Sequence, residues 1–202
     1  MSQEPASPIS EGTGGATLTR YRVDPGHSRF TVQAFAGGLL SFLGHSPTFA
    51  VRDFAGELCW EPDRPEGAGL VVTVRADSLE LIDNVRPADR EDIEGRMRRE
   101  VLEVAAYPDI RFQAAQITTA AAGGNRYRLR ISGMLSLHGV TNRHGIEAEL
   151  LLYNDGVRLG GEFPLRLADY RIRPVTALGG AIQLRDQLRV SFDIVAWREA
   201  PG

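Results

Sequence analysis

Apolar and polar residues alternate along several stretches of the chain, most clearly from Arg126 to Leu137. Successive side chains of a β-strand point to opposite faces, so this pattern gives one apolar face and one polar face. A period of two maintained over such a length predicts a half-buried strand. The predicted inward-facing set is Tyr127, Leu129, Ile131, Leu135 and Leu137, and the opposite face carries arginines and serines.

The same alternation returns in other parts of the chain, and turn residues separate the stretches. The segment Tyr153-Asn154-Asp155-Gly156 has the composition of a hairpin turn, because Asn, Asp and Gly tolerate positive φ. About eight strands joined mostly by short loops predict an all-β domain whose antiparallel sheet closes on itself. Besides 126–137, the main stretches are residues 30–36, 69–76, 146–152, 157–167 and 188–196.

One segment has the period of a helix instead. Asp89 is a plausible N-cap, residues 90–104 follow with an apolar stripe, and Tyr107-Pro108 ends the helix because a residue before proline disfavours helical angles. We therefore expect one amphipathic helix in a connection between strands. Its core-facing stripe is Ile93, Met97, Val101 and Val104.

The other face of this helix is charged. Glu94 and Arg98 stand four residues apart, a spacing that favours an ion pair. Charge runs on helices usually face water, so we expect Arg96, Arg98 and Arg99 to be solvated.

Composition fits one domain with a sizeable core. The chain has 202 residues, 43% of them hydrophobic, and a net charge of −3. Residues 1–17 are rich in Ser, Gly, Glu and Pro without periodicity, so they predict a disordered leader before a domain at 18–202. All 23 basic residues are Arg, and the single cysteine, Cys59, excludes an intrachain disulfide.

The chain shows no sign of a nucleic-acid or membrane role. It lacks the basic balance that phosphate backbones attract, and no window approaches the length of a membrane helix. Its first twenty residues contain neither a basic region nor an apolar region of a secretory signal, so we expect a cytoplasmic protein without stable membrane insertion.

Five short strings stand in a characteristic order between residues 21 and 197. In that order and spacing they resemble the YceI-like, lipocalin-like family of polyisoprenoid-binding proteins. The strings are Tyr21-Arg22-Val23-Asp24, Ala76-Asp77-Ser78-Leu79, Tyr107-Pro108-Asp109-Ile110-Arg111-Phe112, the segment from Ser132 to Thr141, and Asp169-Tyr170-Arg171-Ile172.

The resemblance implies a lipocalin-like barrel that holds a long amphiphile: a polyisoprenoid, an isoprenoid quinone or a fatty-acid-like lipid. It implies no cofactor. With the strand alternation, it makes inward-facing apolar residues the candidate ligand contacts, and His45 a candidate for hydrogen-bonding the head group at the barrel mouth. The apolar candidates are Phe30, Val32, Val72, Val74, Phe112, Leu129, Ile131, Phe163, Leu165, Val190 and Phe192.

Two other function classes stay open. The barrel could support a small-molecule enzyme with His45 as general base, although the chain contains no recognised catalytic motif. It could also be a packed structural or dimerising domain without a ligand, so a homodimer remains compatible with the sequence. A metal site is disfavoured, because His138 and His144 have no paired cysteines and are expected to cap the turn between them.

Overall fold

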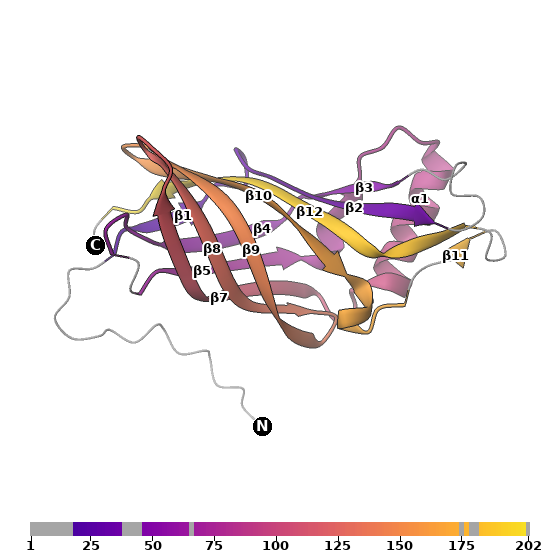
Figure 1. Ribbon diagram of the computed structural model, residues 1–202. Coiled ribbons are helices and arrows are strands. Elements are labelled where there is room, and N and C mark those ends of the chain that lie inside the picture. Colours follow the sequence, from indigo (N-terminus) through magenta and orange to yellow (C-terminus); the bar gives the residue numbers. More distant parts are fainter. Residues whose placement is uncertain (1–17, 38–45, 65–66, 174–175, 178–181, 201–202) are drawn as a thin grey trace, which may run out of the picture.

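The computed structural model describes residues 18–37, 46–64, 67–173, 176–177 and 182–200. Within this part of the chain, eight strand positions form a closed antiparallel ring (Figure 1), which confirms the predicted barrel. Closure occurs where β1 pairs with β4 on one side and with β12 on the other. In order around the ring the strands are β1 (Arg20–Val23), β4 (Phe54–Cys59), β5 (Gly69–Arg75), β7 (Asp109–Ala121), β8 (Arg126–Leu137), β9 (Val140–Leu152), β10 (Gly156–Arg166) and β12 (Ile182–Arg198).

Three of these positions continue as second segments beyond a short break. The strand β2 (Arg29–Gly37) follows β1 along the same edge of β12, and β3 (Thr48–Val51) pairs with β2 as β4 pairs with β1. The strand β6 (Leu79–Leu81) continues β5 after a single turn of 3-10 helix, η1 (Ala76–Ser78), and pairs with β3. The barrel is therefore longer on this side, and a short β11 (Thr176–Ala177) also pairs with β12.

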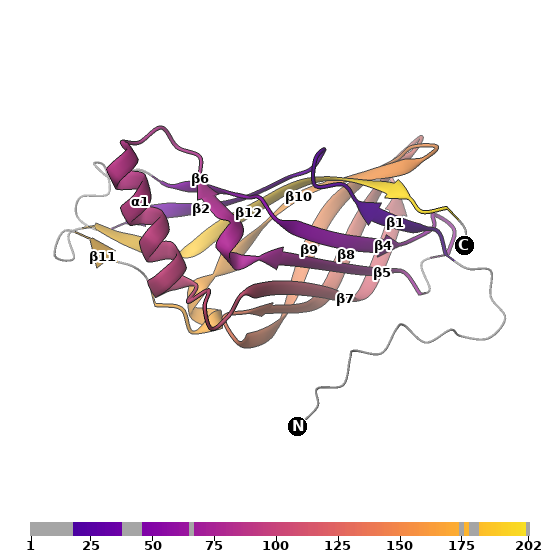
Figure 2. The same cartoon turned by 180° about the vertical axis from the view of Figure 1, so that it is seen from behind.

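The helix lies at the extended end of the barrel (Figures 1 and 2). The α-helix α1 (Pro87–Arg96) runs into a π turn, η2 (Met97–Val101). The helix starts earlier than predicted, because Pro87 occupies its first position, where a missing N–H costs nothing. Asp89 therefore lies in the first turn, and is not the N-cap. Met97 is 7% exposed and belongs to the core, as predicted.

The opposite end of the barrel is filled by aromatic side chains. Trp60 is completely buried, and its indole N–H donates a hydrogen bond to the hydroxyl of Thr119 at 3.1 Å. The ring of Tyr127 meets Trp60 edge-on, with 5.1 Å between the ring centroids. Tyr21 is also buried, and β1 pairs it with Leu58, two residues before Trp60. Large aromatic rings therefore fill the interior at this end, and Trp60 is fixed there by its hydrogen bond to Thr119.

The hairpin between β8 and β9 turns at His138 and Gly139. Both residues have positive φ, 51° and 71°, as a two-residue turn of the type I′ class requires. The turn is thus shorter than predicted. His138 belongs to it, with its Nε2 2.6 Å from a carboxylate oxygen of Glu103, whereas His144 lies well inside β9 and does not cap the turn.

Candidate functional site

An apolar cavity of about 90 Å³ occupies the middle of the barrel. Every described side chain around it is a hydrocarbon or an aromatic ring, so it offers an apolar surface without a charge. The lining residues are Val23, Phe30, Leu58, Leu70, Val72, Val74, Ile110, Phe112, Ile131, Leu135, Ile146, Val157, Leu159, Phe163, Phe192, Ile194 and Ala196.

The strand register brings these side chains together. Alternate residues of each strand point inward, and neighbouring strands place such residues side by side: Val72 is opposite Phe112, and Phe30 is opposite Phe192. Apolar residues from distant parts of the chain thereby form one continuous wall.

Two inward-facing glycines make room for rings of this wall. A Cβ atom at Gly133 would stand 2.6 Å from the ring of Phe112, and one at Gly161 would stand 2.7 Å from the ring of Phe192. Both distances are far below van der Waals contact. Two of the cavity's four aromatic side chains, Phe112 and Phe192, therefore pack against bare backbone, which the alternation of apolar residues does not reveal.

Seven of the predicted ligand contacts line the cavity. The other four apolar candidates are elsewhere: Leu129, Leu165 and Val190 are buried in the core outside the cavity, and Val32 is partly buried against that core. His45 lies outside the described residues. As ligand contacts all twelve stay predictions. The seven around the cavity are Phe30, Val72, Val74, Phe112, Ile131, Phe163 and Phe192.

Sequence reasoning missed ten lining residues. Several, such as Leu70 and Ile146, belong to the alternating stretches 69–76 and 146–152, but the pattern alone does not assign them to the cavity. Whether an inward-facing residue lines the cavity depends on its distance from the two ends of the barrel. That distance follows only from the register of the closed ring. The ten are Val23, Leu58, Leu70, Ile110, Leu135, Ile146, Val157, Leu159, Ile194 and Ala196.

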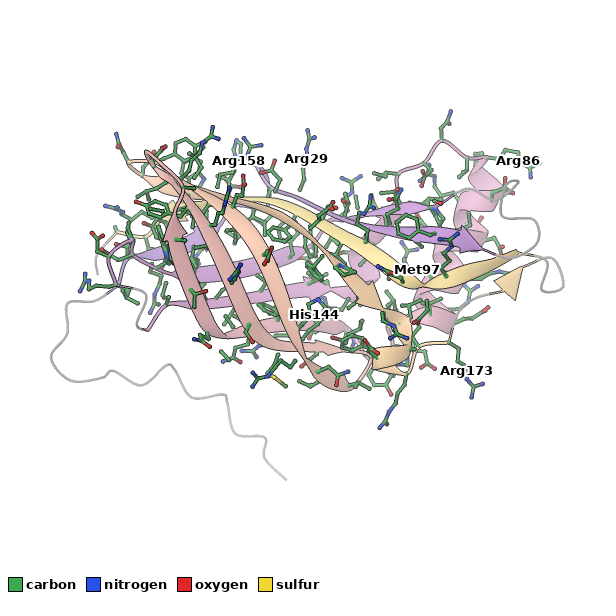
Figure 3. The ribbon with its side chains drawn as sticks, viewed as in Figure 1. Arg29, Arg86, Met97, His144, Arg158 and Arg173 are labelled. Atoms are coloured by element: carbon green, nitrogen blue, oxygen red, sulfur yellow. The ribbon has the colours of Figure 1, made fainter. Side chains whose placement is uncertain are left out.

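His144 is a polar side chain on the inner face of β9 that the sequence did not single out as interior. It has the same parity as the buried Ile146, and its ring contacts that of Phe163, a cavity residue, with 4.9 Å between centroids. Figure 3 shows its position on the strand. Its Nε2 atom is buried and has no hydrogen-bond partner among the described residues.

The barrel wall is unpaired beside His144. The ladder between β9 and β10 ends at the pair of Ala148 and Gly161, although each strand continues to pair with its other neighbour. The two strands are bridged further along by the side-chain amide of Asn142, which donates to the carbonyl oxygen of Asp169 in the following 3-10 turn, η3 (Leu167–Tyr170). His144 and Phe163 therefore face each other across a seam in the wall.

Burial controls the ionisation of the two titratable groups here. It lowers the pKa of His144 below its ordinary value of 6.5, against a smaller opposing effect of the Asp169 carboxylate. Burial also raises the pKa of the Tyr170 hydroxyl, and Asp169 acts in the same direction. Both side chains are consequently neutral at neutral pH.

The described part of the chain offers little for other chemistry. It contains no group of three or more His, Cys, Asp or Glu side chains placed to hold a metal ion. In the same residues, no polar or charged residue is buried as a whole. None of the helices described is long and apolar enough to cross a bilayer.

Comparison with known proteins decides the family. The model of the YceI-like domain matches residues 21–196, nearly the whole barrel. The chain belongs to the YceI-like family. Curated relatives include protein YceI from Salmonella arizonae and a UPF0312 protein from Enterobacter, each 29% identical over 178 residues, which cover 85% of this chain and 84% of the relative.

Solved structures of similar proteins have the same fold as this YceI-like chain. BcnA from Burkholderia cenocepacia is 16% identical with a TM-score of 0.66, covering 86% of this chain and 98% of BcnA. A polyisoprenoid-binding domain from Saccharophagus degradans, described as implicated in plant cell wall breakdown, is 14% identical with a TM-score of 0.65, covering 90% of this chain and 99% of that domain. At such identities the likeness concerns the barrel alone.

Proposed function

We propose that this protein binds a long-chain amphiphile, such as a polyisoprenoid, an isoprenoid quinone or a fatty-acid-like lipid, inside the barrel. The observation that carries the proposal is the cavity inside the barrel, whose described lining consists only of apolar side chains. Burying a methylene group contributes roughly 0.8 kcal/mol, so a wall of this kind favours a long hydrocarbon chain. The polyisoprenoid-binding neighbour from Saccharophagus degradans supports the same ligand class.

Binding requires the cavity to widen. An apolar cavity of roughly 150 Å³ can hold one benzene molecule, whereas this cavity measures about 90 Å³. Phe30 and Val72 line it and are only partly buried, so their side chains have room to turn. We therefore expect a ligand chain to displace lining side chains, and a short ligand to bind poorly because it repays little of the lost freedom.

Binding, not catalysis, fits the site. An enzyme needs at least one positioned polar group at the reacting atoms, and the wall of this cavity has none. His45, the predicted base, lies outside the described residues. The cytoplasmic location and the homodimer stay predictions from the sequence.

The test is native mass spectrometry of the purified protein together with analysis of the lipids extracted from it. We expect adducts whose masses match long-chain amphiphiles, and rebinding after delipidation that strengthens with chain length. A delipidated protein that binds no member of a length series would contradict the proposal and favour a packed domain without a ligand.

A further inference from the structure

His144 Nε2 is the buried side-chain atom without a hydrogen-bond partner in the part of the chain that the structure describes. A buried polar group left unpaired costs roughly 1–3 kcal/mol, and native proteins satisfy nearly all such groups. The other side-chain nitrogens and oxygens buried in these residues have partners. An atom of this kind inside a barrel that receives a ligand is placed to hydrogen-bond that ligand.

Its position is at the end of the cavity nearer to α1. Ile146 lines the cavity, and His144 follows two residues further along the same face of β9, about 7 Å away at the rise of a strand. Phe163 joins the two, since it lines the cavity and its ring contacts the imidazole. A long ligand fits this cavity only if lining side chains move and the cavity becomes longer. If the cavity extends past Phe163, the ligand reaches His144 Nε2.

The surroundings of His144 favour a neutral ligand group over an anionic one. A neutral imidazole has one nitrogen that donates and one that accepts, so it pairs equally well with a hydroxyl or a carbonyl. An anionic phosphate or carboxylate would need a cation, and no Arg lines the cavity. The charge that acts on His144 is the carboxylate of Asp169, which repels anions.

We infer that the ligand of this barrel carries a single neutral hydrogen-bonding group, a hydroxyl or a carbonyl, that binds His144 Nε2 at the end of the cavity nearer to α1. The inference rests on the proposed function and adds the class of head group. An isoprenoid alcohol or quinone fits it, and a prenyl phosphate with its head buried at this site does not.

The experiment compares three ligands with the same carbon skeleton: geranylgeraniol, its phosphate ester, and the hydrocarbon that lacks the hydroxyl group. Their affinities are measured by native mass spectrometry on the delipidated full chain. One net hydrogen bond predicts that the alcohol binds about two- to tenfold more tightly than the hydrocarbon, and that the phosphate binds no better than the hydrocarbon.

Variants test the residue. His144→Phe retains a ring against Phe163 but removes both nitrogens, so it should abolish the preference for the alcohol and leave hydrocarbon binding unchanged. His144→Gln retains a donor and an acceptor and should restore much of the preference. His27→Ala is the control, since this histidine is 72% exposed and lies at the other end of the barrel beside Trp197; it should change nothing.

The outcomes separate this inference from the proposed function. If all three ligands bind with equal affinity, or His144→Phe keeps the preference for the alcohol, His144 bonds only to water and the inference is wrong while the lipid-binding proposal stands. Tightest binding of the phosphate would also overturn it. If no ligand binds the wild-type chain, the proposed function itself fails.

Discussion

Burial decides the charge of His144, and this has a consequence for stability. Its folded pKa lies below the ordinary value of 6.5 because the ring is desolvated against Phe163. In the unfolded chain the ring titrates near 6.5. As the pH falls below that value, the unfolded state therefore takes up a proton that the folded state does not, and the free energy of unfolding decreases.

His144→Phe removes this proton uptake but retains the ring contact. We expect the free energy of unfolding of the wild type to fall more steeply than that of the variant between about pH 7 and pH 5. Urea denaturation at a series of pH values measures the difference, and the remaining histidines are common to both proteins. Parallel pH profiles would show that His144 titrates normally in the folded protein.

The histidines also mark the limit of sequence reasoning at this scale. His138 and His144 were expected to cap one turn, but only His138 lies in it, at positive φ. The alternation of β9 places residue 144 on the same face as Ile146, so the sequence pattern does indicate that His144 faces the interior. What the pattern could not show is that the ladder to β10 stops at Gly161. His144 therefore lies in a seam, where its Nε2 has no hydrogen-bond partner in the described part of the chain.

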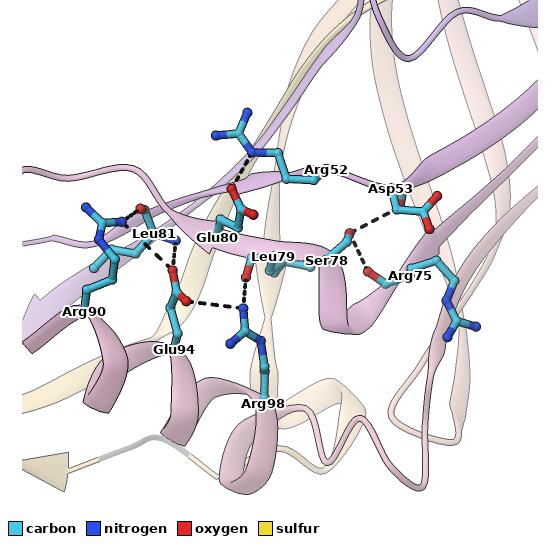
Figure 4. Close-up of polar contacts among 10 residues, drawn as sticks. All are labelled: Arg52, Asp53, Arg75, Ser78, Leu79, Glu80, Leu81, Arg90, Glu94 and Arg98. Carbon is cyan, nitrogen blue, oxygen red and sulfur yellow. Dashed lines mark hydrogen bonds and ion pairs between the residues drawn. The ribbon is translucent and has the colours of Figure 1, made fainter. Parts of the chain in front are cut away.

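At the scale of elements, α1 serves the sheet as a cap for an exposed edge (Figure 4). Among the described strands, β6 has a neighbour on one side only, and helix side chains take the place of a strand on the other side. A carboxylate oxygen of Glu94 accepts a hydrogen bond from the backbone N–H of Leu81 at 2.9 Å, and Arg98 donates to the carbonyl oxygen of Leu79 at 3.4 Å. Arg90 donates to the carbonyl oxygen of Leu81. An unpaired edge invites pairing with another chain, so this cap also protects against aggregation.

The predicted pair of Glu94 and Arg98 is confirmed at 3.3 Å, but the predicted role of its face is only partly right. Arg96 pairs with Asp92 on the exposed side. Arg98 turns towards β6 instead of water, because the strand edge offers it a carbonyl oxygen. A charge pattern on one helix cannot reveal an acceptor contributed by another element.

Glu94→Ala should therefore lower the free energy of unfolding by about 1–3 kcal/mol, because it leaves the backbone N–H of Leu81 unpaired in a partly buried place. Glu94→Gln keeps an acceptor for this N–H and should cost less. Glu91→Ala, an exposed position of the same helix, is the control and should stay within about 0.5 kcal/mol. Equal stabilities of Glu94→Ala and Glu91→Ala in urea denaturation would contradict the capping role.

The two faces of β8 allow a second prediction at this scale. Ile131 is 2% exposed and lines the cavity, so Ile131→Ala should lower stability by roughly 2–5 kcal/mol and shift binding towards bulkier chains. Its neighbour Arg130 is 82% exposed and pairs with Glu147 at 3.4 Å, a surface pair that contributes little. Arg130→Ala should change stability by under about 0.5 kcal/mol. Thermal melts and a titration with a fluorescent fatty chain check both, and equal effects would mean that the inward face of β8 is assigned wrongly.

For the whole molecule, the sequence predicts the ring but not its divided strands or its hollow centre. The alternating stretches match β8, β9, β10 and β12, since a strand with one buried face shows its period directly. The break between β1 and β2 depends on local contacts: the carboxylate of Asp24 accepts from the backbone N–H of Gly26 at 2.9 Å. Whether the interior is packed or open depends on the summed volume of the inward side chains from all eight strand positions. No single stretch of sequence contains this information.

The closure of the barrel also indicates where the folded domain begins. Ring closure depends on β1, which starts at Arg20. Among the described residues, the preceding Thr19 is the first one bound to the barrel through its backbone, because its carbonyl oxygen accepts from the N–H of Trp60 at 3.0 Å. Residues 1–17 have no apolar pattern to bury. The predicted domain at 18–202 should therefore fold without them.

A variant that lacks residues 1–17 should melt within about 2 °C of the full chain, a shift that corresponds to under about 1 kcal/mol for a domain of this size, and should keep its ligand. A variant that lacks residues 1–23 is the matched control. It also loses β1, which leaves the facing edges of β4 and β12 without their shared partner, so it should lose cooperative unfolding or melt far lower. Differential scanning calorimetry of both variants, with and without a long-chain ligand, measures the two effects. A clear loss of melting temperature on removing residues 1–17 alone would show that the leader docks on the barrel, and the domain would then begin at the start of the chain.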